Sequence, residues 1–362
     1  MLNILIQTGP GIGDMLQKLP MASSIKSQYP DANIDFITSC SPQNFKTISQ
    51  VIECQNYVRS LYWYRIDYKL HCAALLLKLR MNHYDIGFVR DGGMITTSSK
   101  PSMWIFRIMR LAGVKKLAGY IRDRVDIFVD VPEFTHLIER DRLTLNAAGI
   151  NAPMTFETID RSKLDFTFEN YERLKNSKAR KVIALSVGTN EYHWFVNGKG
   201  IAYDVKSWDY KKWLELAVRL ADEGFSVILL GGKRERERMS EKNLAVPENE
   251  ENENENIFDF IGKTSIKQSL ALLSLCSLVV GSDGGMMHCA SGLGVKTLTI
   301  FGGSDYRLWT PAGGEILTLG LECSPCFGSL RAVECQYHRC LEEISVEMVF
   351  NRIMKIVSRS GE

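Results

Sequence analysis

Residues 279–288 read Val279-Val280-Gly281-Ser282-Asp283-Gly284-Gly285-Met286-Met287-His288, which predicts a buried strand joined to a helix by a glycine turn. Gly284 and Gly285 leave backbone N–H groups facing the start of that helix, where an anion such as a diphosphate fits. Asp283 could accept hydrogen bonds from sugar hydroxyls, and His288 could donate to a phosphate. Alternatively, Asp283 is a helix cap and His288 a hydrogen-bonded core histidine.

Strand and helix patterns alternate on both sides of this stretch. Strands are expected at 2–7, 34–38, 86–89 and 127–131, and again at 182–187, 226–230, 278–281 and 297–301. This alternation predicts an α/β protein with two facing Rossmann-like domains and a ligand cleft between them. We expect an N-terminal domain at 1–170, a second domain at 171–345, and a C-terminal helix at 346–362 that packs back on the N-terminal domain.

Composition narrows the class of protein. A chain of 362 residues is long enough for two domains, and its net charge of +2 gives no reason to expect nucleic-acid binding. The N-terminal apolar run is too short for a signal peptide, and no segment has the ~20 apolar residues of a membrane-spanning helix. We therefore expect a cytoplasmic protein with at most peripheral contact with a membrane. The basic and apolar stretch 104–110 fits such contact or core packing, and 248–256 is expected to be a mobile surface loop.

The first strand is followed by a loop that reads Gly9-Pro10-Gly11-Ile12-Gly13-Asp14. Its glycine spacing does not match the dinucleotide fingerprint, so a nicotinamide cofactor is not indicated. Glycines nevertheless let the backbone approach a substrate closely. Asp14 falls at a helix start that faces the expected cleft, where it is either a capping residue or a catalytic carboxylate.

Two further charged residues lie beside predicted elements, one before a helix and one after a strand. Lys206 lies in the loop before a helix that begins near residue 210, where it could neutralise a diphosphate or be a solvated lysine. Glu235 follows Gly231-Gly232 at a strand end. It could bind a ribose or be one charge on an exposed helix.

The nine cysteines fall into two groups. Five are scattered in apolar contexts and are expected in the core: Cys40, Cys54, Cys72, Cys276 and Cys289. The other four form a C-x2-C pair followed by a C-x4-C pair, spacing that is typical of a structural zinc or iron site, with His338 as a spare ligand. These four are Cys323, Cys326, Cys335 and Cys340.

In their order along the chain, these motifs resemble glycosyltransferase family 9, the bacterial lipopolysaccharide heptosyltransferases. The likeness spans most of the chain and is most specific in residues 257–340. It rests on Ile12-Gly13-Asp14 with Leu19-Pro20, Lys206-x-Trp208, Gly231-Gly232, Gly262-Lys263-Thr264-Ser265, Gly281 to Gly285 with His288 and Ala290, and Phe301-Gly302-Gly303-Ser304 with Trp309 and Pro311.

The resemblance implies a GT-B fold and inverting transfer of a heptose from a nucleotide donor, usually ADP-heptose, without a catalytic metal. It also implies that any peripheral membrane contact is with the inner membrane, where lipopolysaccharide acceptors lie. Asp14 would be the general base, Lys206 would stabilise the diphosphate, Glu235 would contact the ribose or base, and Asp283 would hold the heptose. The chain contains no Asp-x-Asp triplet, which agrees with metal-independent catalysis. The full expected donor-binding set is Gly13, Thr189, Lys206, Gly232, Glu235, Asp283, Gly284, Gly285 and His288.

Two departures from the family leave the substrates open. Family members usually have Ser or Thr where this chain has Gly284, and the loop from Thr189 to Val205 is long and aromatic. The acceptor is therefore a lipopolysaccharide core or related glycan, or a protein as in the autotransporter heptosyltransferases. A third alternative is a catalytically silent module that binds a sugar nucleotide or a partner.

Overall fold

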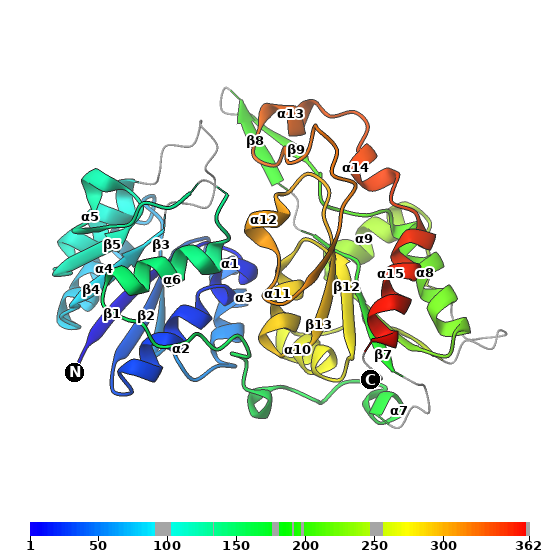
Figure 1. Cartoon of the computed structure of the whole chain (residues 1–362), viewed down its shortest axis with the longest axis horizontal. Coiled ribbons are helices and arrows are strands. Elements are labelled where there is room, and N and C mark those ends of the chain that lie inside the picture. The colour runs from blue at the N-terminus through cyan, green and yellow to red at the C-terminus, as the bar shows by residue number, and fades with distance from the viewer. Residues whose placement is uncertain are drawn as a thin grey trace. The chain divides into compact units, whose positions relative to one another are not determined.

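The structure of the chain is a computed structural model that describes residues 1–90, 103–132, 134–175, 181–189, 192–196, 199–246 and 256–359. The chain divides into two compact units, Met1–Lys163 and Leu164–Glu362, which Figure 1 colours from blue to green and from green to red. The sequence places the boundary after residue 170, and the chain divides after Lys163. Each unit has its own parallel sheet and its own apolar core.

A six-stranded parallel sheet forms the centre of the first unit, with the strand order β3-β2-β1-β4-β5-β6. The strands are β1 (Asn3–Thr8), β2 (Asn33–Ser39), β3 (Ser60–Tyr64), β4 (Ile86–Val89), β5 (Lys116–Gly119) and β6 (Ile127–Phe128). The middle strands are buried on both faces, which is why they read as continuous apolar runs such as 4–6. Strand order reverses between β1 and β4, and such a reversal opens a ligand crevice at the carboxyl ends of the strands.

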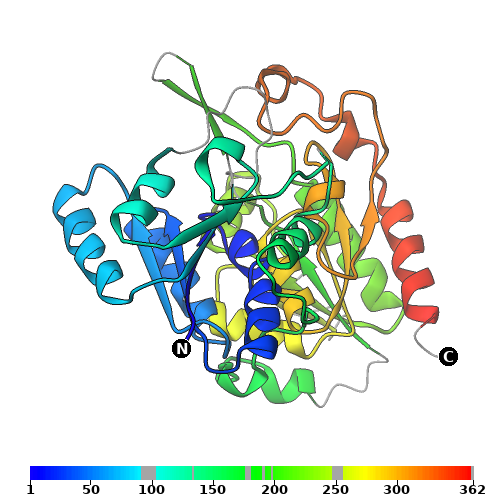
Figure 2. The same cartoon turned by 60° about the vertical axis from the view of Figure 1, so that its left-hand side comes forward.

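Helices cover both faces of this sheet. The helices are α1 (Ile12–Leu16), α2 (Leu19–Gln28), α3 (Pro42–Ile52), α4 (Lys69–Met81), α5 (Met103–Leu111) and α6 (Leu137–Ala147), with short 3-10 turns at Arg122–Arg124 and Arg161–Lys163. Leu79 of α4 and Met109 of α5 share a buried cluster with Leu5 and Leu117 of the strands. α2 and α6 lie side by side, as Figures 1 and 2 show.

The second unit repeats the topology of the first. Its six parallel strands have the order β11-β10-β7-β12-β13-β14, so β7 occupies the place of β1, β10 that of β2 and β12 that of β4. The strands are β7 (Val182–Ser186), β10 (Ser226–Leu230), β11 (Ile257–Asp259), β12 (Leu278–Ser282), β13 (Lys296–Ile300) and β14 (Glu315–Leu317). The prediction of two Rossmann-like α/β domains is therefore confirmed, and the reversal in this sheet lies between β7 and β12.

The helices of the second unit include one that differs from expectation. They are α7 (Tyr171–Lys175), α8 (Tyr210–Asp222), α9 (Lys233–Glu241), α10 (Ile266–Ser274), α11 (Gly285–Gly292), α12 (Tyr306–Trp309), α13 (Leu330–Glu334), α14 (Arg339–Glu342) and α15 (Val346–Ser358). The C-terminal helix, expected to pack on the N-terminal domain, is α15, and it packs against α8 in the second unit. The reason is its buried stripe, which includes Val349, Phe350 and Ile353 and joins the core of this unit.

Of two other stretches, one differs from what the sequence predicts and one lies almost entirely outside the residues that the structure describes. The backbone of the aromatic loop 189–205 forms an antiparallel hairpin of β8 (Tyr192–Val196) and β9 (Lys199–Tyr203), in keeping with the strand preference of aromatic and β-branched residues. The polar segment 248–256 lies outside the described residues except for Asn256. Among the described helices, none is both long enough and apolar enough to span a bilayer.

Candidate functional site

Asp14 lies in the first unit, where the turn after β1 leads into α1. The backbone N–H of Gly11 donates to Asp14 Oδ2 over 3.3 Å, so the carboxylate caps its own helix as the sequence allows. A Cβ atom at Gly9 would lie 2.4 Å from Asp14 Cγ, so the turn needs glycine there to pass this carboxylate. The side chain of Asp14 remains 24% exposed, which leaves it accessible to a ligand. Gly13 lies within the same helix and its carbonyl accepts from the N–H of Gln17.

Arg90 is a neighbour of Asp14 that the sequence did not single out. It follows β4, the strand next to β1 at the order reversal, and its Nη1 lies 3.3 Å from Asp14 Oδ1. The Arg90 side chain is only 4% exposed, and its backbone N–H donates to Gln7 Oε1 over 3.0 Å. The sequence feature that could have indicated Arg90 is its position directly after the apolar run 86–89. The reversal in the first sheet therefore carries an arginine–carboxylate pair.

The reversal in the second sheet carries a buried lysine–carboxylate pair. Asp283 follows β12, and Lys206 Nζ lies 2.6 Å from its Oδ2, with both side chains less than 10% exposed. Lys206 Nζ also lies 4.3 Å from the centre of the Phe327 ring, a cation–π arrangement. Lys206 is therefore a partly enclosed cation and not a solvated loop lysine. Removing either partner of such a buried pair leaves an uncompensated charge.

The glycine turn after Asp283 leads into α11. Gly284 is the N-cap of this helix in an extended conformation, and a Cβ there would meet only ordinary contacts, at 3.6 Å from Gly188 O and Ser282 O. A side chain therefore fits at Gly284, and glycine is not required by space. The N–H groups of the first turn of α11, beginning with Gly285, form the positive end of its dipole. His288 is buried in this helix, which agrees with the alternative that it is a core histidine.

Glu235 lies in the first turn of α9, which follows β10, the second strand in the order of this sheet. Its Oε2 accepts a hydrogen bond of 2.7 Å from the N–H of Gly232, and a Cβ at Gly188 would lie 2.5 Å from its Cδ. Asp14 and Glu235 are thus held in the same way, by the N–H of the glycine that precedes the helix. In dinucleotide-binding sheets an acidic residue after the second strand binds a ribose hydroxyl, and Glu235 occupies the corresponding place.

Thr189 completes a contiguous group in the second unit. Its Oγ1 lies 2.7 Å from Ser207 Oγ, next to Lys206, and the N–H of Trp208 donates to Ser282 Oγ, next to Asp283. The structure therefore brings together the expected residues Thr189, Lys206, Gly232, Glu235, Asp283, Gly284 and Gly285 at the carboxyl ends of β7, β10 and β12, whereas His288 lies buried further along α11. Gly13 and Asp14 belong to the first unit and form a separate group with Arg90.

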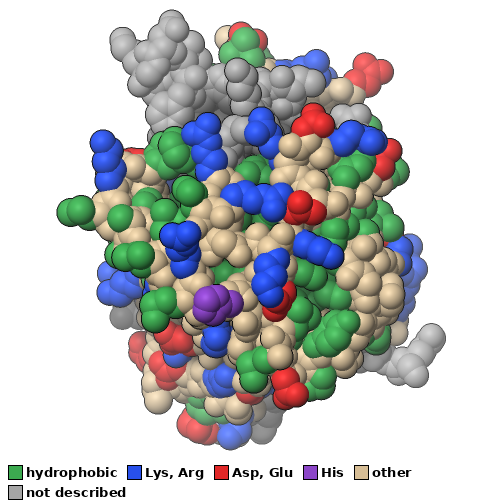
Figure 3. All heavy atoms as spheres, turned by 90° about the vertical axis from the view of Figure 1, so that its left-hand side faces the viewer, with side chains coloured by type: hydrophobic (Ala, Val, Ile, Leu, Met, Phe, Trp, Pro, Cys, Tyr) green, Lys and Arg blue, Asp and Glu red, His purple; other side chains and the backbone are tan. Residues whose placement is uncertain are grey.

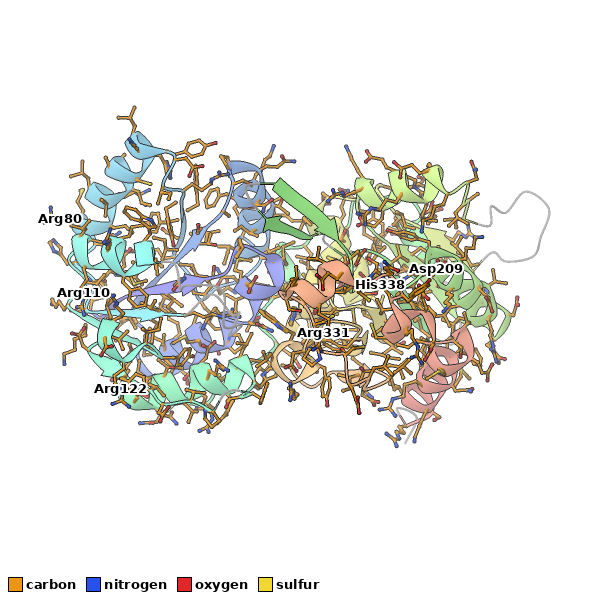
Figure 4. All side chains as sticks on the ribbon, turned by 90° about the horizontal axis from the view of Figure 1, so that it is seen from above. Arg80, Arg110, Arg122, Asp209, Arg331 and His338 are labelled. Atoms are coloured by element: carbon orange, nitrogen blue, oxygen red, sulfur yellow. The ribbon has the colours of Figure 1, made fainter. Side chains whose placement is uncertain are left out.

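The four late cysteines line one cavity of about 30 Å³ together with His338, which Figure 4 labels beside Arg331. Burial, followed by the nearby thiols of Cys335 and Cys323, raises the pKa of the Cys326 thiol to about 11. Burial likewise raises the pKa of Cys340 to about 11. None of the nine cysteines forms a disulfide. Within the described part of the chain, however, no three His, Cys, Asp or Glu side chains are arranged so that they could hold a metal ion.

The cysteine-rich segment is attached to the loop that carries Lys206. The N–H groups of Cys326 and Phe327 both donate to Gly303 O over 2.8 Å, and the N–H of Gly303 donates to Val205 O over 2.8 Å. A Cβ at Gly303 would lie 2.7 Å from Val205 Cβ, so only glycine permits this approach. The segment therefore supports the lysine through backbone hydrogen bonds as well as through the Phe327 ring.

Solved structures of other proteins show the same architecture. The structure of Escherichia coli ADP-heptose lps heptosyltransferase II covers 100% of both chains with a TM-score of 0.67 and 17% sequence identity. The crystal structure of a glycosyl transferase family 9 protein from Veillonella parvula covers 99% of this chain and 97% of its own, with a TM-score of 0.70 and 14% identity. The fold is thus that of the GT-B glycosyltransferases.

The family follows from the sequence comparisons. Lipooligosaccharide heptosyltransferase 2 of Campylobacter jejuni is 21% identical over 366 residues, which is 99% of this chain and 99% of the relative. The sequence pattern of glycosyltransferase family 9 (heptosyltransferase) matches residues 73–336. The chain belongs to glycosyltransferase family 9 and is therefore an enzyme that transfers a glycosyl group. The resemblance read from the motifs is confirmed.

Proposed function

We propose that this enzyme transfers a heptose from ADP-heptose, with inversion, to a lipopolysaccharide-core or related glycan acceptor. The observation that carries the proposal is the buried Lys206–Asp283 pair, which lies at the order reversal of the second sheet and directly before the N-terminus of α11. The names of the E. coli and C. jejuni relatives support the choice of donor and acceptor class.

The donor would bind to the second unit. Its diphosphate would lie against the N–H groups of α11 and the ammonium of Lys206, which take up the charge that develops as ADP leaves. Asp283 would then accept from heptose hydroxyls, and Glu235 would accept from the ribose. A cation and helix dipole inside a buried site stabilise charge more strongly than the same groups do in water.

The acceptor hydroxyl would be activated by Asp14. As this hydroxyl oxygen attacks the anomeric carbon, its proton passes to an Asp14 oxygen and the bond from that carbon to the diphosphate oxygen breaks. Arg90 would hold the Asp14 carboxylate in position on one oxygen, Oδ1, while the Gly11 N–H contacts the other. Attack from the face opposite the leaving ADP inverts the configuration.

Turnover of ADP-heptose tests the proposal. We expect Asp14→Ala to abolish transfer while ADP binding survives, and Lys206→Met to weaken both. Because a single change leaves a buried charge without its partner, at a cost of about 3–5 kcal/mol, the double variant Lys206→Met/Asp283→Asn is the control for folding. It should fold and still fail to turn over the donor, whereas the exposed Lys211→Ala should match the wild type. Full activity in Asp14→Ala would refute the assigned base.

Two alternatives, one for the acceptor and one for the role of the protein, would give different results in this turnover assay. A protein acceptor would be indicated by transfer of heptose to a polypeptide and not to a lipopolysaccharide core. A catalytically silent module would bind ADP-heptose without releasing ADP in the presence of either acceptor. The two ion pairs at the strand-order reversals, Arg90–Asp14 and Lys206–Asp283, would suit either role, and membership of a glycosyltransferase family is what favours an enzyme over a silent module.

We also propose that the four late cysteines bind a structural zinc or iron ion. The residue types fit, because four thiols line one small cavity, but their present arrangement is not that of a metal site. Binding would therefore require the segment 323–340 to draw the sulfurs together. Elemental analysis of protein purified without chelator, compared with Cys323→Ser/Cys326→Ser, should show about one metal ion per chain that the variant lacks.

A further inference from the structure

α4 is apolar on both of its faces. Its inner face contributes Leu75 and Leu79 to the core of the first unit. Its outer face carries Leu70, Leu77 and Met81, which are 90%, 66% and 78% exposed. Ala73 and Ala74 are exposed on the same face. This spacing of three to four residues makes a continuous apolar stripe, whereas the outer face of a surface helix is normally polar.

α5 continues the surface, because it packs beside α4 in the same core cluster. Trp104 and Leu111 are 44% and 59% exposed, and the Arg107 guanidinium lies 5.2 Å from the centre of the Trp104 ring. From the sequence alone, the stretch 104–110 fits either core packing or membrane contact. The structure divides it, because residues 105, 106, 108 and 109 are buried and residues 104, 107 and 110 are exposed.

The charged side chains that α4 and α5 themselves contribute are all basic, and one of them, Arg110, pairs with Asp126 over 2.9 Å. α4 and α5 together contain five basic residues and no Asp or Glu: Lys69, Lys78, Arg80, Arg107 and Arg110. Figure 3 views this side of the molecule, where hydrophobic and basic side chains are interspersed, and Figure 4 labels Arg80 and Arg110 on it. Residues 1–163 hold 20 Lys and Arg against 15 Asp and Glu, whereas residues 164–362 hold 24 against 27. The positive charge of the protein is thus concentrated in the unit that carries the stripe.

We propose that the outer face of α4 and α5 docks on an anionic lipid bilayer, lying in its interface without crossing it. The leucine, methionine and tryptophan side chains enter the boundary between headgroups and acyl chains. The lysine and arginine side chains extend along the apolar surface and place their charges among lipid phosphates. The inference rests on the proposed function, because a lipid-anchored acceptor is reached from a membrane surface.

The charge pattern distinguishes this occupant from a second copy of the chain. A two-fold symmetric dimer through the same face would bring five basic residues from each protomer together without a single acid from α4 or α5. An anionic bilayer complements both the positive charge and the apolar stripe.

Flotation with vesicles tests the docking surface in the full-length protein. Two kinds of vesicle are compared. One contains phosphatidylcholine with about 30% phosphatidylglycerol, an anionic lipid that attracts basic segments, and the other contains pure phosphatidylcholine. The variants are an apolar triple, Leu70→Gln/Leu77→Gln/Met81→Gln, and a basic triple, Lys69→Gln/Lys78→Gln/Arg80→Gln. The control, Phe156→Gln/Met348→Gln, removes exposed apolar side chains elsewhere.

Wild type and control should partition onto the anionic vesicles. We expect the apolar triple to lower the partition coefficient at least about tenfold, and the basic triple to lower it on the order of a hundredfold, with little binding of any variant to pure phosphatidylcholine. A blue shift of tryptophan emission on vesicle binding should disappear in Trp104→Phe.

Three results would overturn the inference: no binding of wild type to anionic vesicles, equal binding of the triples and the control, or conversion of a dimer to a monomer by the apolar triple in sedimentation velocity. Release of ADP with an acceptor that lacks its lipid anchor should be unchanged in both triples. That measurement keeps the docking surface separate from the proposed function, which would be contradicted by a fully active Lys206→Met in the same assay.

Discussion

Arg90 Nη1 lies 3.3 Å from Asp14 Oδ1 and links the end of β4 to the turn after β1. The arginine is buried while the carboxylate is partly exposed, so the arginine can orient the carboxylate without blocking it. The Asp14 carboxylate is therefore held by two contacts, a backbone N–H from the turn after β1 and a guanidinium from the residue after β4.

Arg90 is accordingly expected to act as a positioning residue for Asp14. Arg90→Gln should lower kcat roughly ten- to a hundredfold, because a misplaced reacting group loses most of its advantage, and should leave the KM for ADP-heptose nearly unchanged. Arg90→Lys should restore part of kcat. Steady-state kinetics with melting curves check this, and a rise in donor KM at constant kcat would contradict the assignment.

The Phe327 ring should contribute to donor binding through Lys206. Replacement by leucine keeps an apolar side chain but removes the cation–π contact, which is worth about 1–2 kcal/mol in a buried setting. We expect Phe327→Leu to weaken ADP-heptose binding roughly five- to thirtyfold, as measured by calorimetry, and Phe327→Tyr to bind almost as well as wild type. Equal affinities in leucine and tyrosine variants would show that the ring only fills space.

Two glycines near the proposed donor site should respond in opposite ways when a side chain is added. Gly284 has room for a side chain, so Gly284→Ser should leave the melting temperature close to that of wild type and add a hydroxyl donor for the phosphate. At Gly188, a Cβ would collide with Glu235, so Gly188→Ala should displace this carboxylate and raise the KM for the donor. Differential scanning fluorimetry with ADP reports both effects, and a destabilised Gly284→Ser would contradict the assigned space.

In protein stripped of metal by a chelator, the buried thiols should make the free energy of unfolding fall at alkaline pH, whereas thiols bound to a metal ion would already be deprotonated. Burial raises the pKa of Cys326 and Cys340 from 9.0 to about 11, so between pH 9 and 11 the unfolded chain loses these protons while the folded chain keeps them. The free energy of unfolding therefore decreases as pH rises through this window. The loss should be smaller in Cys326→Ser/Cys340→Ser than in wild type when denaturant titrations at pH 8 and pH 10.5 are compared. An identical loss in both proteins would place its origin in other groups.

The sequence predicted the parts of the fold that depend on local pattern. Apolar runs of four to six residues mark strands buried on both faces, and glycines after them mark the turns, so both α/β halves and the motif at Asp283 were recognisable. Strand order was not, because pairing between distant strands leaves no local trace. The sequence already indicated Glu235 as a ribose contact, and the strand order adds that it follows the strand next to β7.

Contacts between distant residues account for what the sequence did not predict at the site. Arg90 has no motif of its own, and its partner lies 76 residues earlier in the chain. The outer stripe of α4 was hidden for a different reason, since a helix that is apolar on both faces lacks the one-sided pattern that marks an amphipathic helix. Cysteine spacing indicated a cluster but could not give the distances between the four sulfurs.

The shared way of holding Asp14 and Glu235 has a consequence for engineering. In both places a backbone N–H of the preceding glycine contacts the acid, so each position is set by a segment of three or four residues. The Arg90–Asp14 pair lies wholly in residues 1–163 and the Lys206–Asp283 pair wholly in residues 164–362. Chimaeras that exchange whole halves between members of the family at residue 163 would keep both pairs intact, which makes this junction the natural place to recombine acceptor and donor preferences.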